Sequence, residues 1–255
     1  MTVQAVFDHI NARFPVSSAL PGDNIGILAG DPAAEVTRVM LALDCTPAVV
    51  QEAAQMGCEL IITHHPLIFR PLGRVNPGHF VTDALTALLK NDIALISMHT
   101  NLDAGADGVN NCLAAALGLQ DVELLPDAEG IGRMGTLPEA MDGDAFLRHV
   151  KASLDAPGLR HTPLTGDIRK VAVGGGACGD YWEQAVAAGC DALVTADIKY
   201  GMFSYAAHAG LLLIDAGHFS TENTVIEPLG ESLQQAFPEL IFFISAVHGD
   251  VTCFA

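Results

Sequence analysis

Imidazole and carboxylate side chains follow three apolar segments of the chain. The segments are ELIIT at 59–63, IALISM at 93–98 and LLLID at 211–215. The side chains at or just after their ends are His64, His65, His99, Asp103, Asp215, His218 and Glu222. If the segments are parallel strands, these side chains meet at the edge of the sheet where open α/β folds bind ligands. Imidazole and carboxylate ligands without thiolate favour Zn²⁺, Mn²⁺, Fe²⁺ or Co²⁺ over Ca²⁺ or an iron–sulfur cluster.

The spacing of these residues indicates more than one ion. Neighbouring side chains on an extended strand point to opposite sides, so His64 and His65 can serve different positions. His218 and Glu222 are four residues apart and would share a face of any helix formed there. The set exceeds the three or four ligands of one zinc ion, which indicates two ions. A single histidine at a strand end is more often capped or solvated, so the prediction rests on the whole set.

The elements expected to position these residues alternate between strands and helices. Strands are expected at 39–43, 59–63 and 93–98, and helices at 47–57, 80–91 and 108–117. A Pro in the first turn, as at Pro47, and a Gly at the end, as at Gly57, are typical helix boundaries. This order predicts an α/β fold with a mainly parallel sheet that helices cover on both faces.

A segment of the first half of the chain resembles a segment of the second half. Residues 52–63 read EAAQMGCELIIT and residues 184–195 read QAVAAGCDALVT, an offset of 132. After the next expected strand, His99-x-x-x-Asp103 is matched by His218-x-x-x-Glu222. Two unrelated α/β units can resemble each other by chance, but the repeated histidine–acid pair favours two related α/β lobes. Their boundary is expected near 104–125.

The charge balance disfavours some classes of partner. The chain has 255 residues, of which 30 are acidic and 12 basic, a formal net charge of -18, and 50% are hydrophobic. This apolar content excludes a disordered chain, and the few basic side chains disfavour nucleic acid or an anionic membrane as partner. No apolar run approaches the roughly 18 residues that span a bilayer, and the N-terminus lacks an apolar signal segment. The six cysteines form no C-x-x-C pair, so we expect a cytoplasmic protein with reduced, buried thiols.

Three further features concern the substrate. Arg70 and Arg74 follow the histidine pair and could bind a phosphate group beside a metal; the alternative is a solvated loop. The Gly-rich run at 174–179 could present backbone N–H groups to an anion at a helix N-terminus, although tight backbone packing is the commoner reason for such a run. Asp23 and Asn24 either line the pocket or form a turn.

The chain resembles the dinuclear-metal family of GTP cyclohydrolase 1 type 2 homologues, also called the NGG-interacting-factor-three-like family. The resembling stretches are PGDNIGILAGDP at 21–32, LIITHHPLIF at 60–69, SMHTNLDAG at 97–105, GIGRMGTLPE at 130–139, TADIKYG at 195–201 and DAGHFSTE at 215–222. The combination of THHPLIF with G-H-x-x-x-E is highly specific. The family commonly has Gly where Ala196 stands and often His where Gly201 stands, so the pocket rim differs while the ligands are intact.

The resemblance implies a ligand set, a cofactor and an assembly. The implied metal ligands are His64, His65, Asp103, His218 and Glu222, which would hold two divalent metal ions per chain (Zn, Mn, Fe or Co). It also implies two α/β lobes, one formed by residues 1–103 with 226–255 and the other by residues 104–225. The metals would lie between the lobes, and six chains would form a toroidal homohexamer.

These expectations favour a metal-dependent hydrolase that acts on a small nucleotide-like or phosphorylated molecule. If the cyclohydrolase name of the family applies, the attack falls on the purine carbon between the two imidazole-ring nitrogens of GTP. His99 is then the candidate for proton transfer, because an imidazole titrates near neutrality. A phosphoesterase reaction would suit the same site. The competing interpretation is a non-catalytic metal-binding hexameric scaffold that acts through protein partners.

Overall fold

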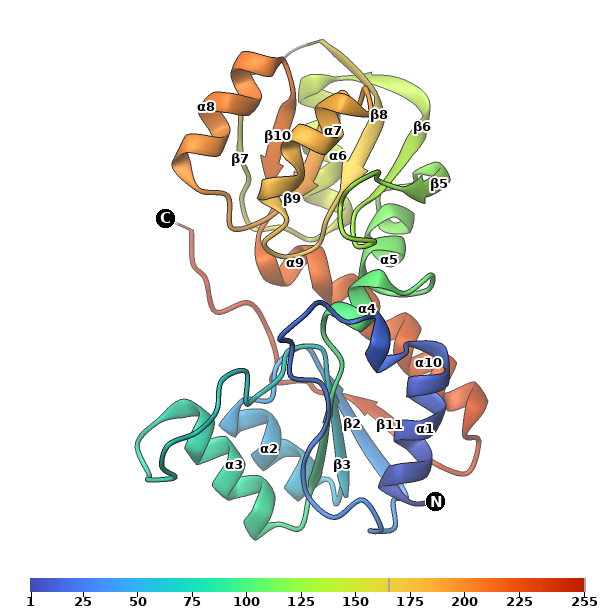
Figure 1. The fold of residues 1–255 in the computed structure, drawn as a ribbon, viewed down its shortest axis with the longest axis vertical. Helices are drawn as coiled ribbons and strands as arrows, with labels where there is room; N and C mark the ends of the chain where they lie inside the picture. Colours follow the sequence, from blue (N-terminus) through green and yellow to red (C-terminus); the bar gives the residue numbers. More distant parts are fainter. Residues whose placement is uncertain (165, 255) are drawn as a thin grey trace. The chain divides into compact units, whose positions relative to one another are not determined.

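The computed structural model describes residues 1–164 and 166–254, which form two compact units (Figure 1). The first unit contains Met1–Leu102 and Ile226–Gly249. The second contains Asp103–Val225 and the residues from Asp250 onward. Each unit has its own sheet and its own helices, so the fold is mixed α/β.

The sheet of the first unit has the strand order β1-β4-β3-β2-β11. Its strands are β1 (Gly26–Ala29), β2 (Arg38–Ala42), β3 (Leu60–Thr63), β4 (Ala94–Ser97) and β11 (Ile241–Ile244). Strands β4, β3, β2 and β11 run parallel, while β1 pairs antiparallel with β4. Because Thr63 lies beside both Ala42 and Ser97, the residues that follow β2, β3 and β4 emerge at one edge of the sheet.

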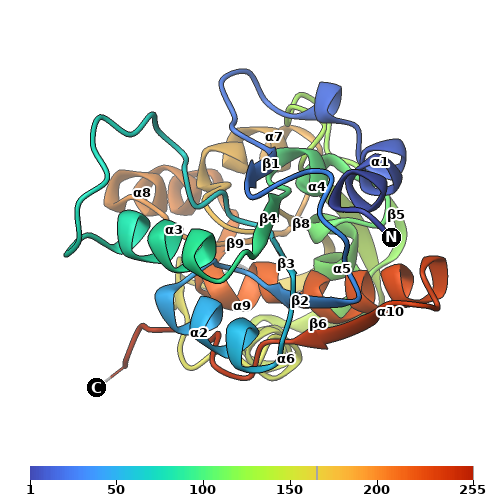
Figure 2. The same cartoon turned by 90° about the horizontal axis from the view of Figure 1, so that it is seen from below.

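Helices cover both faces of this sheet (Figure 2). They are α1 (Val3–Arg13), α2 (Pro47–Gln55), α3 (Phe80–Lys90) and α10 (Ile226–Ala236), with the short η1 (Val16–Ser18) and α4 (Thr100–Ala104), which contains the unit boundary. On the face covered by α2 and α3, Met40 and Ile61 pack with Val50. On the other face, a Cβ on Gly230 of α10 would lie 2.9 Å from Cδ1 of Leu41. Burial on both faces explains the apolar run at 39–42 of β2.

Helix α2 shows how the sequence sets an element boundary. The hydroxyl of Thr46 accepts a hydrogen bond from the Val49 N–H at 3.1 Å, and Pro47 occupies the first turn, where its missing N–H costs no hydrogen bond. After the helix, Gly57 has a φ of +67°, a conformation that glycine adopts without steric cost. The expected helix at 47–57 is therefore present with both boundary residues in the expected roles.

The sheet of the second unit has the strand order β5-β6-β8-β9-β10-β7. Its strands are β5 (Gln120–Leu124), β6 (Arg133–Asp142), β7 (Arg160–His161), β8 (Asp167–Val173), β9 (Ala192–Thr195) and β10 (Leu212–Asp215). Among the described strands of this second sheet, only the pairings of β9 with β8 and β10 are parallel. The prediction of a mainly parallel sheet is wrong here, because the connection from β5 to β6 is too short for a helical crossover and permits only antiparallel pairing.

Helices also lie on both faces of the second sheet (Figure 1). They are α5 (Val109–Ala116), α6 (Gly143–Ser153), α7 (Trp182–Ala187), α8 (Tyr200–Ala209) and α9 (His218–Glu222), with the short η2 (Gly179–Tyr181) and η3 (Asn223–Val225). Phe146 of α6 packs with Val171 and Val194 on one face. Ala185 of α7 and Leu193 belong to the cluster on the other face.

The internal sequence repeat extends to individual hydrogen bonds. In the first unit, the carboxylate of Glu59 accepts from the N–H groups of Thr37 and Arg38 at 3.0 and 2.8 Å. In the second, the carboxylate of Asp191 accepts from the N–H groups of Arg169 and Lys170 at 2.9 and 2.8 Å. These three residues correspond at the offset of 132. The β-α-β segments of the two units therefore share contacts as well as residue types.

The basic residue of each set makes a matching bond. Arg38 donates from Nη1 to the carbonyl of Met56 at 2.9 Å, and Lys170 donates from Nζ to the carbonyl of Ala188 at 2.8 Å. Both carbonyls belong to the residue that ends the intervening helix. A cation at a helix C-terminus is favoured by the helix dipole. One basic residue thus connects the first strand of each segment to the end of its helix.

We expect Glu59→Gln to lower the free energy of unfolding by about 1–3 kcal/mol at pH 7, because an ionised acceptor for two backbone N–H groups is lost. Burial raises the pKa of Glu59, but the hydrogen bonds from Thr37 and Arg38 outweigh it and lower that pKa. The carboxylate therefore stabilises the fold above its unfolded pKa of about 4.3, and the stabilisation is lost as pH falls through the lower folded pKa. The difference in the free energy of unfolding between wild type and Glu59→Gln, measured by urea unfolding, should become smaller between pH 5 and pH 3.

The matched control for this prediction is Glu239→Gln, which changes an exposed carboxylate of the same unit. A Glu59→Gln variant as stable as Glu239→Gln at pH 7 would contradict the assigned role.

Half of the six cysteines are buried, two are half-buried and one is exposed. Cys45, Cys58 and Cys190 are buried, and burial raises the pKa of Cys45 to about 12 and those of Cys58 and Cys190 to about 11. Cys253 is exposed, so the expectation of buried thiols is wrong there, because this residue lies in a C-terminal segment outside the helices and strands. None of the helices in the described residues has the length and apolar character that crossing a bilayer requires.

Candidate metal centre

Three histidines of the first unit lie together beyond the carboxyl ends of β3 and β4. The ring centroid of His64 is 4.8 Å from that of His65 and 5.3 Å from that of His99. One ring nitrogen from each lies within 4.8 Å of the other two. His64 is only 1% exposed, so its imidazole is an internal group. The three side chains form a group whose nitrogen atoms could bind a metal ion.

Neighbouring carboxylates orient two of these rings. His65 Nδ1 lies 2.9 Å from Oδ1 of Asp44, and His99 Nδ1 lies 2.9 Å from Oδ1 of Asp23. An ionised carboxylate only accepts hydrogen bonds, so each neutral ring carries its hydrogen on Nδ1 and its lone pair on Nε2. Metal-binding histidines are commonly held in this way by a carboxylate. The first unit thus contains oriented imidazoles rather than solvated ones.

Asp23, whose place the sequence left undecided between the pocket and a turn, contacts the histidine group. Its side chain is 3% exposed, and besides His99 it accepts from the N–H of Thr100 at 3.1 Å and from its hydroxyl at 2.5 Å. Burial raises the pKa of Asp23, but the hydrogen bonds from Thr100 and His99 outweigh it and lower that pKa. Asp23 precedes β1, whereas His99 follows β4, far away in sequence. Only the fold brings Asp23 and His99 together.

The surroundings of His99 also shift its pKa. Burial lowers the pKa of His99, the neighbouring His64 lowers it further, and Asp23 opposes both effects; the net shift is downward. His99 is therefore neutral at and above neutral pH and able to accept a proton.

The second unit contributes two carboxylates and one imidazole. Asp103 and Glu222 are 7% and 4% exposed, and one carboxylate oxygen of each lies within 4.8 Å of the other. His218 and Glu222 lie one turn apart on α9, with His218 Nε2 3.1 Å from Glu222 Oε2. The expectation that these two residues share a helix face is confirmed. Oxygen and nitrogen donors so close together are the donor set expected for a divalent transition metal.

The Gly-rich run packs against these donors. A Cβ on Gly176 would lie 2.1 Å from Glu222 Oε1 and 3.0 Å from His218 Nε2, and the residue has a φ of +62°. The Gly175 and Gly176 N–H groups donate to Asn110 Oδ1 and Thr221 Oγ1 at 2.7 and 3.0 Å. These N–H groups are used within the protein, so the run provides close packing around the donors. The donor chemistry and the space left by Gly176 both fit a metal at Glu222 and His218.

We expect Gly176→Ala to destabilise the protein by about 1–3 kcal/mol more than Gly189→Ala and to weaken metal binding. Both glycines have a positive φ, of +62° and +72°, but nothing lies within 4 Å of a Cβ on Gly189. The two variants therefore share the backbone cost, about 1–2 kcal/mol, and differ in the contact with Glu222. Thermal unfolding and metal titration measure the difference; equal behaviour would contradict this role of Gly176.

Asp215 supports the loops around the second group rather than binding within it. It is 8% exposed and accepts from Arg160, from the Ile198 N–H at 3.3 Å and from the Gly217 N–H at 3.2 Å. The carboxylate thereby holds the residue after Asp197 and the residue before His218. The residue that the sequence placed among the strand-end donors is thus part of the scaffold of the site.

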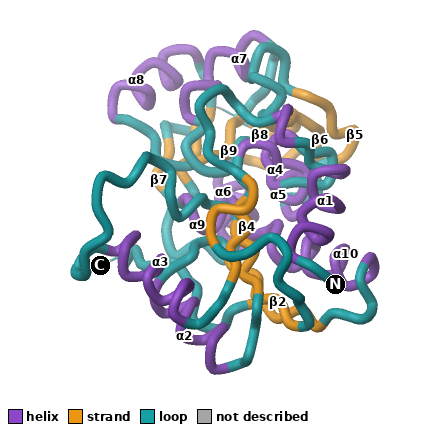
Figure 3. The backbone as a smooth tube through the Cα atoms, turned by 60° about the horizontal axis from the view of Figure 1, so that its bottom comes forward, coloured by secondary structure: helices purple, strands orange, loops and turns teal. Residues whose placement is uncertain are grey.

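The two candidate phosphate-binding arginines lie on the irregular loop 64–79 between β3 and α3, drawn as loop in Figure 3. The guanidinium carbon of Arg70 is 6.0 Å from the ring centroid of Phe69, and that ring is 6.0 Å from His99. Arg70 is thus connected to the histidine group through Phe69.

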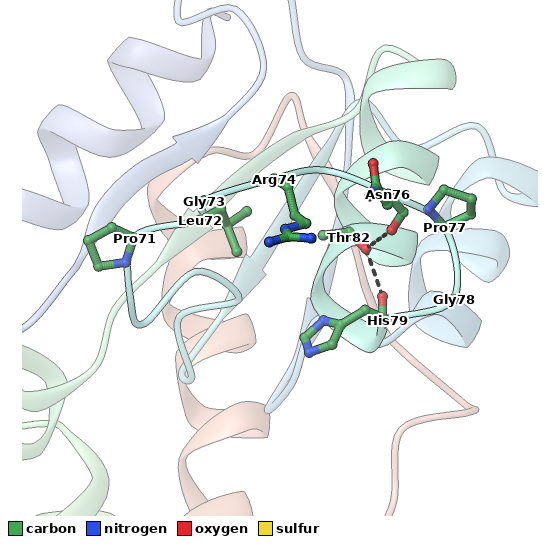
Figure 4. A pocket seen from close by; sticks show the side chains of 9 residues that line it. All are labelled: Pro71, Leu72, Gly73, Arg74, Asn76, Pro77, Gly78, His79 and Thr82. Carbon is green, nitrogen blue, oxygen red and sulfur yellow. Dashed lines mark hydrogen bonds between the residues drawn. The ribbon is translucent and has the colours of Figure 1, made fainter.

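Arg74 lines a pocket of about 330 Å³ on the same loop, together with His79 (Figure 4). Thr82 of α3 closes the loop there, since its hydroxyl donates to the carbonyls of Asn76 at 2.5 Å and His79 at 3.1 Å. Arg70 is not among the residues that line this pocket. The structure therefore gives the two arginines different surroundings.

The two groups of histidine and carboxylate side chains, each beyond the strand ends of a mixed α/β unit, define an α/β protein whose side chains could bind a metal ion. The chain belongs to the family Duf34/NIF3 (NGG1p interacting factor 3), whose model matches residues 1–250. The resemblance seen in the sequence motifs is thereby confirmed.

Individual relatives cover almost the whole chain. It is 33% identical over 250 residues to a Clostridium perfringens protein named GTP cyclohydrolase 1 type 2 homolog, covering 96% of this chain and 95% of that protein. A Lactococcus lactis protein of the same name is 36% identical over 225 residues, 86% of each chain. The structure of a Bacillus cereus protein related to NIF3 matches with a TM-score of 0.94 and 26% identity, over 100% of this chain and 99% of that one.

Proposed function

We propose that the protein is a metal-dependent hydrolase that acts on a small nucleotide-like or phosphorylated molecule. The observation that carries the proposal is the donor chemistry: imidazoles in one unit, and carboxylates and an imidazole in the other. Carboxylates contact the rings of His65, His99 and His218. The proposed metal ligands are His64, His65, Asp103, His218 and Glu222, for two divalent ions per chain. The name of the relatives, GTP cyclohydrolase 1 type 2 homolog, supports a nucleotide substrate.

A bound divalent ion would supply a water of lowered pKa and would polarise the electrophile. Proton transfer and substrate binding are assigned to residues of the protein. His99 is proposed to accept and return the proton at Nε2, because Asp23 holds Nδ1 and the lowered pKa keeps the ring neutral at pH 7. Arg70 and Arg74 are proposed to bind the phosphate oxygens of the substrate. We extend the proposal to the assembly and location that the family resemblance implied, a homohexamer in the cytoplasm.

The test combines metal analysis with an assay. The purified protein is reconstituted with Zn²⁺, Mn²⁺, Fe²⁺ or Co²⁺, its metal content is measured by elemental analysis, and each form is assayed against nucleotides and phosphoesters. About two ions per chain and turnover that His64→Ala abolishes would support the proposal. Fewer than about 0.3 equivalents of every metal would contradict the metal site.

If the arginines bind phosphate, Arg70→Ala and Arg74→Ala should raise KM about 10–150-fold for a phosphorylated substrate and change kcat little. A lost charged hydrogen bond of about 1.5–3 kcal/mol that acts equally in ground and transition states has this effect. Arg148→Ala, in α6, is the control. An unchanged KM would show that the arginine concerned is a solvated loop residue.

A second candidate, a non-catalytic metal-binding scaffold, is favoured by an exposed aromatic surface on α8. Tyr200 and Tyr205 are 87% and 63% exposed, and Tyr205 stacks on Trp182 with ring centroids 6.2 Å apart. Tyrosine and tryptophan are enriched where proteins bind one another. Full metal content without turnover on any substrate of the panel would favour this function over the hydrolase.

A further inference from the structure

Each unit pairs a carboxylate with a histidine in the same way. Asp44 lies two residues after the end of β2 and contacts His65, which lies two residues after the end of the parallel neighbour β3. Asp197 lies two residues after the end of β9 and contacts His218, three residues after the end of the parallel neighbour β10. In both units, the carboxylate and the histidine therefore follow the carboxyl ends of two neighbouring parallel strands.

The contact in the second unit is the shorter one. His218 Nδ1 lies 2.7 Å from Oδ2 of Asp197, against 2.9 Å for His65 Nδ1 and Asp44. Both distances lie in the range of a charge-assisted hydrogen bond. Both ring nitrogens face a carboxylate that can only accept, and Asp197 is the nearer of the two, so the shorter bond favours the hydrogen of a neutral His218 ring on Nδ1. The lone pair is then on Nε2, the nitrogen 3.1 Å from Glu222.

The backbone holds Asp197 where this bond requires it. Asp197 has a φ of +52°, a left-handed conformation that Asp and Asn tolerate better than other side chains with a Cβ. Its neighbours are fixed on both sides, because the Ala196 N–H donates to the Gly176 carbonyl at 2.8 Å and the Ile198 N–H donates to Asp215 at 3.3 Å. The loop therefore presents the Asp197 carboxylate to His218 in a defined orientation.

We propose that Asp197, and in a similar way Asp44 in the first unit, is a positioning residue that fixes the Nδ1–H form of its histidine and so presents Nε2 as the metal donor. The inference deepens the proposed function and rests on it for the identity of the ligand. Removing a carboxylate that orients a metal-binding histidine costs about 10–100-fold in metal affinity. That loss is the expected effect of removing Asp197.

The test compares Asp197→Ala and Asp197→Asn with the control Asp155→Ala. Asp155 is an exposed residue of the same unit with a similar φ of +47°, so its replacement carries the same backbone cost without a histidine partner. Competition with a chelating indicator measures the Zn²⁺ and Co²⁺ affinity of each full-length protein. We expect a loss of about 10–100-fold for Asp197→Ala, a smaller loss for Asp197→Asn, whose amide oxygen still accepts, and an unchanged affinity for Asp155→Ala.

A second readout does not need the metal. In metal-free protein at pH 8, nitrogen NMR distinguishes which ring nitrogen of His218 is protonated, and the signal is identified by its absence in His218→Gln. Wild type should show Nδ1–H, and Asp197→Ala should shift the ring toward Nε2–H. An unchanged tautomer, or Asp197→Ala with the same metal affinity as Asp155→Ala, would overturn the inference.

The two readouts separate this inference from the proposed function. If the wild type binds no metal, the metal-dependent hydrolase is wrong, and the His218 tautomer alone then decides whether Asp197 positions the ring. If Asp197→Ala does not fold, Asp197→Asn carries the comparison, because asparagine suits the left-handed backbone. Asp44→Ala provides the same test for His65 in the first unit.

Discussion

Glu222→Gln should reduce the metal content of the reconstituted protein at least 10-fold. Glu222 is 4% exposed and lies against Gly176, so a glutamine of nearly the same shape fits the space and only the charge is lost. A neutral amide is a much poorer ligand for a divalent transition metal than a carboxylate. Elemental analysis after reconstitution with Zn²⁺ or Mn²⁺ measures the effect.

The control is Glu227→Gln, which changes an exposed carboxylate five residues further along the chain, on α10. It should keep the wild-type metal content. A Glu222→Gln variant that binds as much metal as Glu227→Gln would remove Glu222 from the ligand set.

His99→Gln should lower kcat about 10²–10⁴-fold, the usual range for the loss of a group that transfers a proton. The glutamine retains a polar side chain beside Asp23 but cannot accept a proton near neutrality. The measurement is kcat on whichever substrate of the panel the wild type turns over, together with metal content. Retained metal with reduced kcat supports proton transfer.

The alternative to proton transfer is that His99 binds the metal. His99 lies within 4.8 Å of His64 and His65 through a ring nitrogen, so it could instead be a ligand. Loss of metal in His99→Gln, in step with loss of turnover, would assign it to the metal. An unchanged kcat would exclude both roles.

The sequence predicted the elements that carry the donors because both faces of each parallel core are buried. Continuous apolar segments such as β3, which is followed at once by His64, and β10, which ends at Asp215, are visible without any structure. The spacing of His218 and Glu222 predicts that they share a face if a helix forms there, and the structure has that helix as α9. The predicted strand at 93–98 is likewise present as β4 (Ala94–Ser97).

The carboxylates that orient the histidines could not be predicted in the same way. Asp23, Asp44 and Asp197 are separated from their histidines by 76, 21 and 21 residues, and ordinary turn residues have the same appearance in a sequence. The antiparallel strands β5 and β6 were also missed, since β5 has little buried apolar surface and no clear alternation marks it. The order of the strands in the sheet brings these distant polar residues together, and a single sequence does not show that order.

The discontinuity of the first unit has a consequence for how the chain folds as it is made. Strand β11 (Ile241–Ile244) completes the first sheet beside β2, yet it is synthesised only after the whole of Asp103–Val225. Until then β2 has an unpaired edge, which is a site for wrong pairing with another chain. The second unit has almost all of its sequence in one stretch, so a nascent chain on the ribosome should acquire protease resistance there before the first sheet is closed.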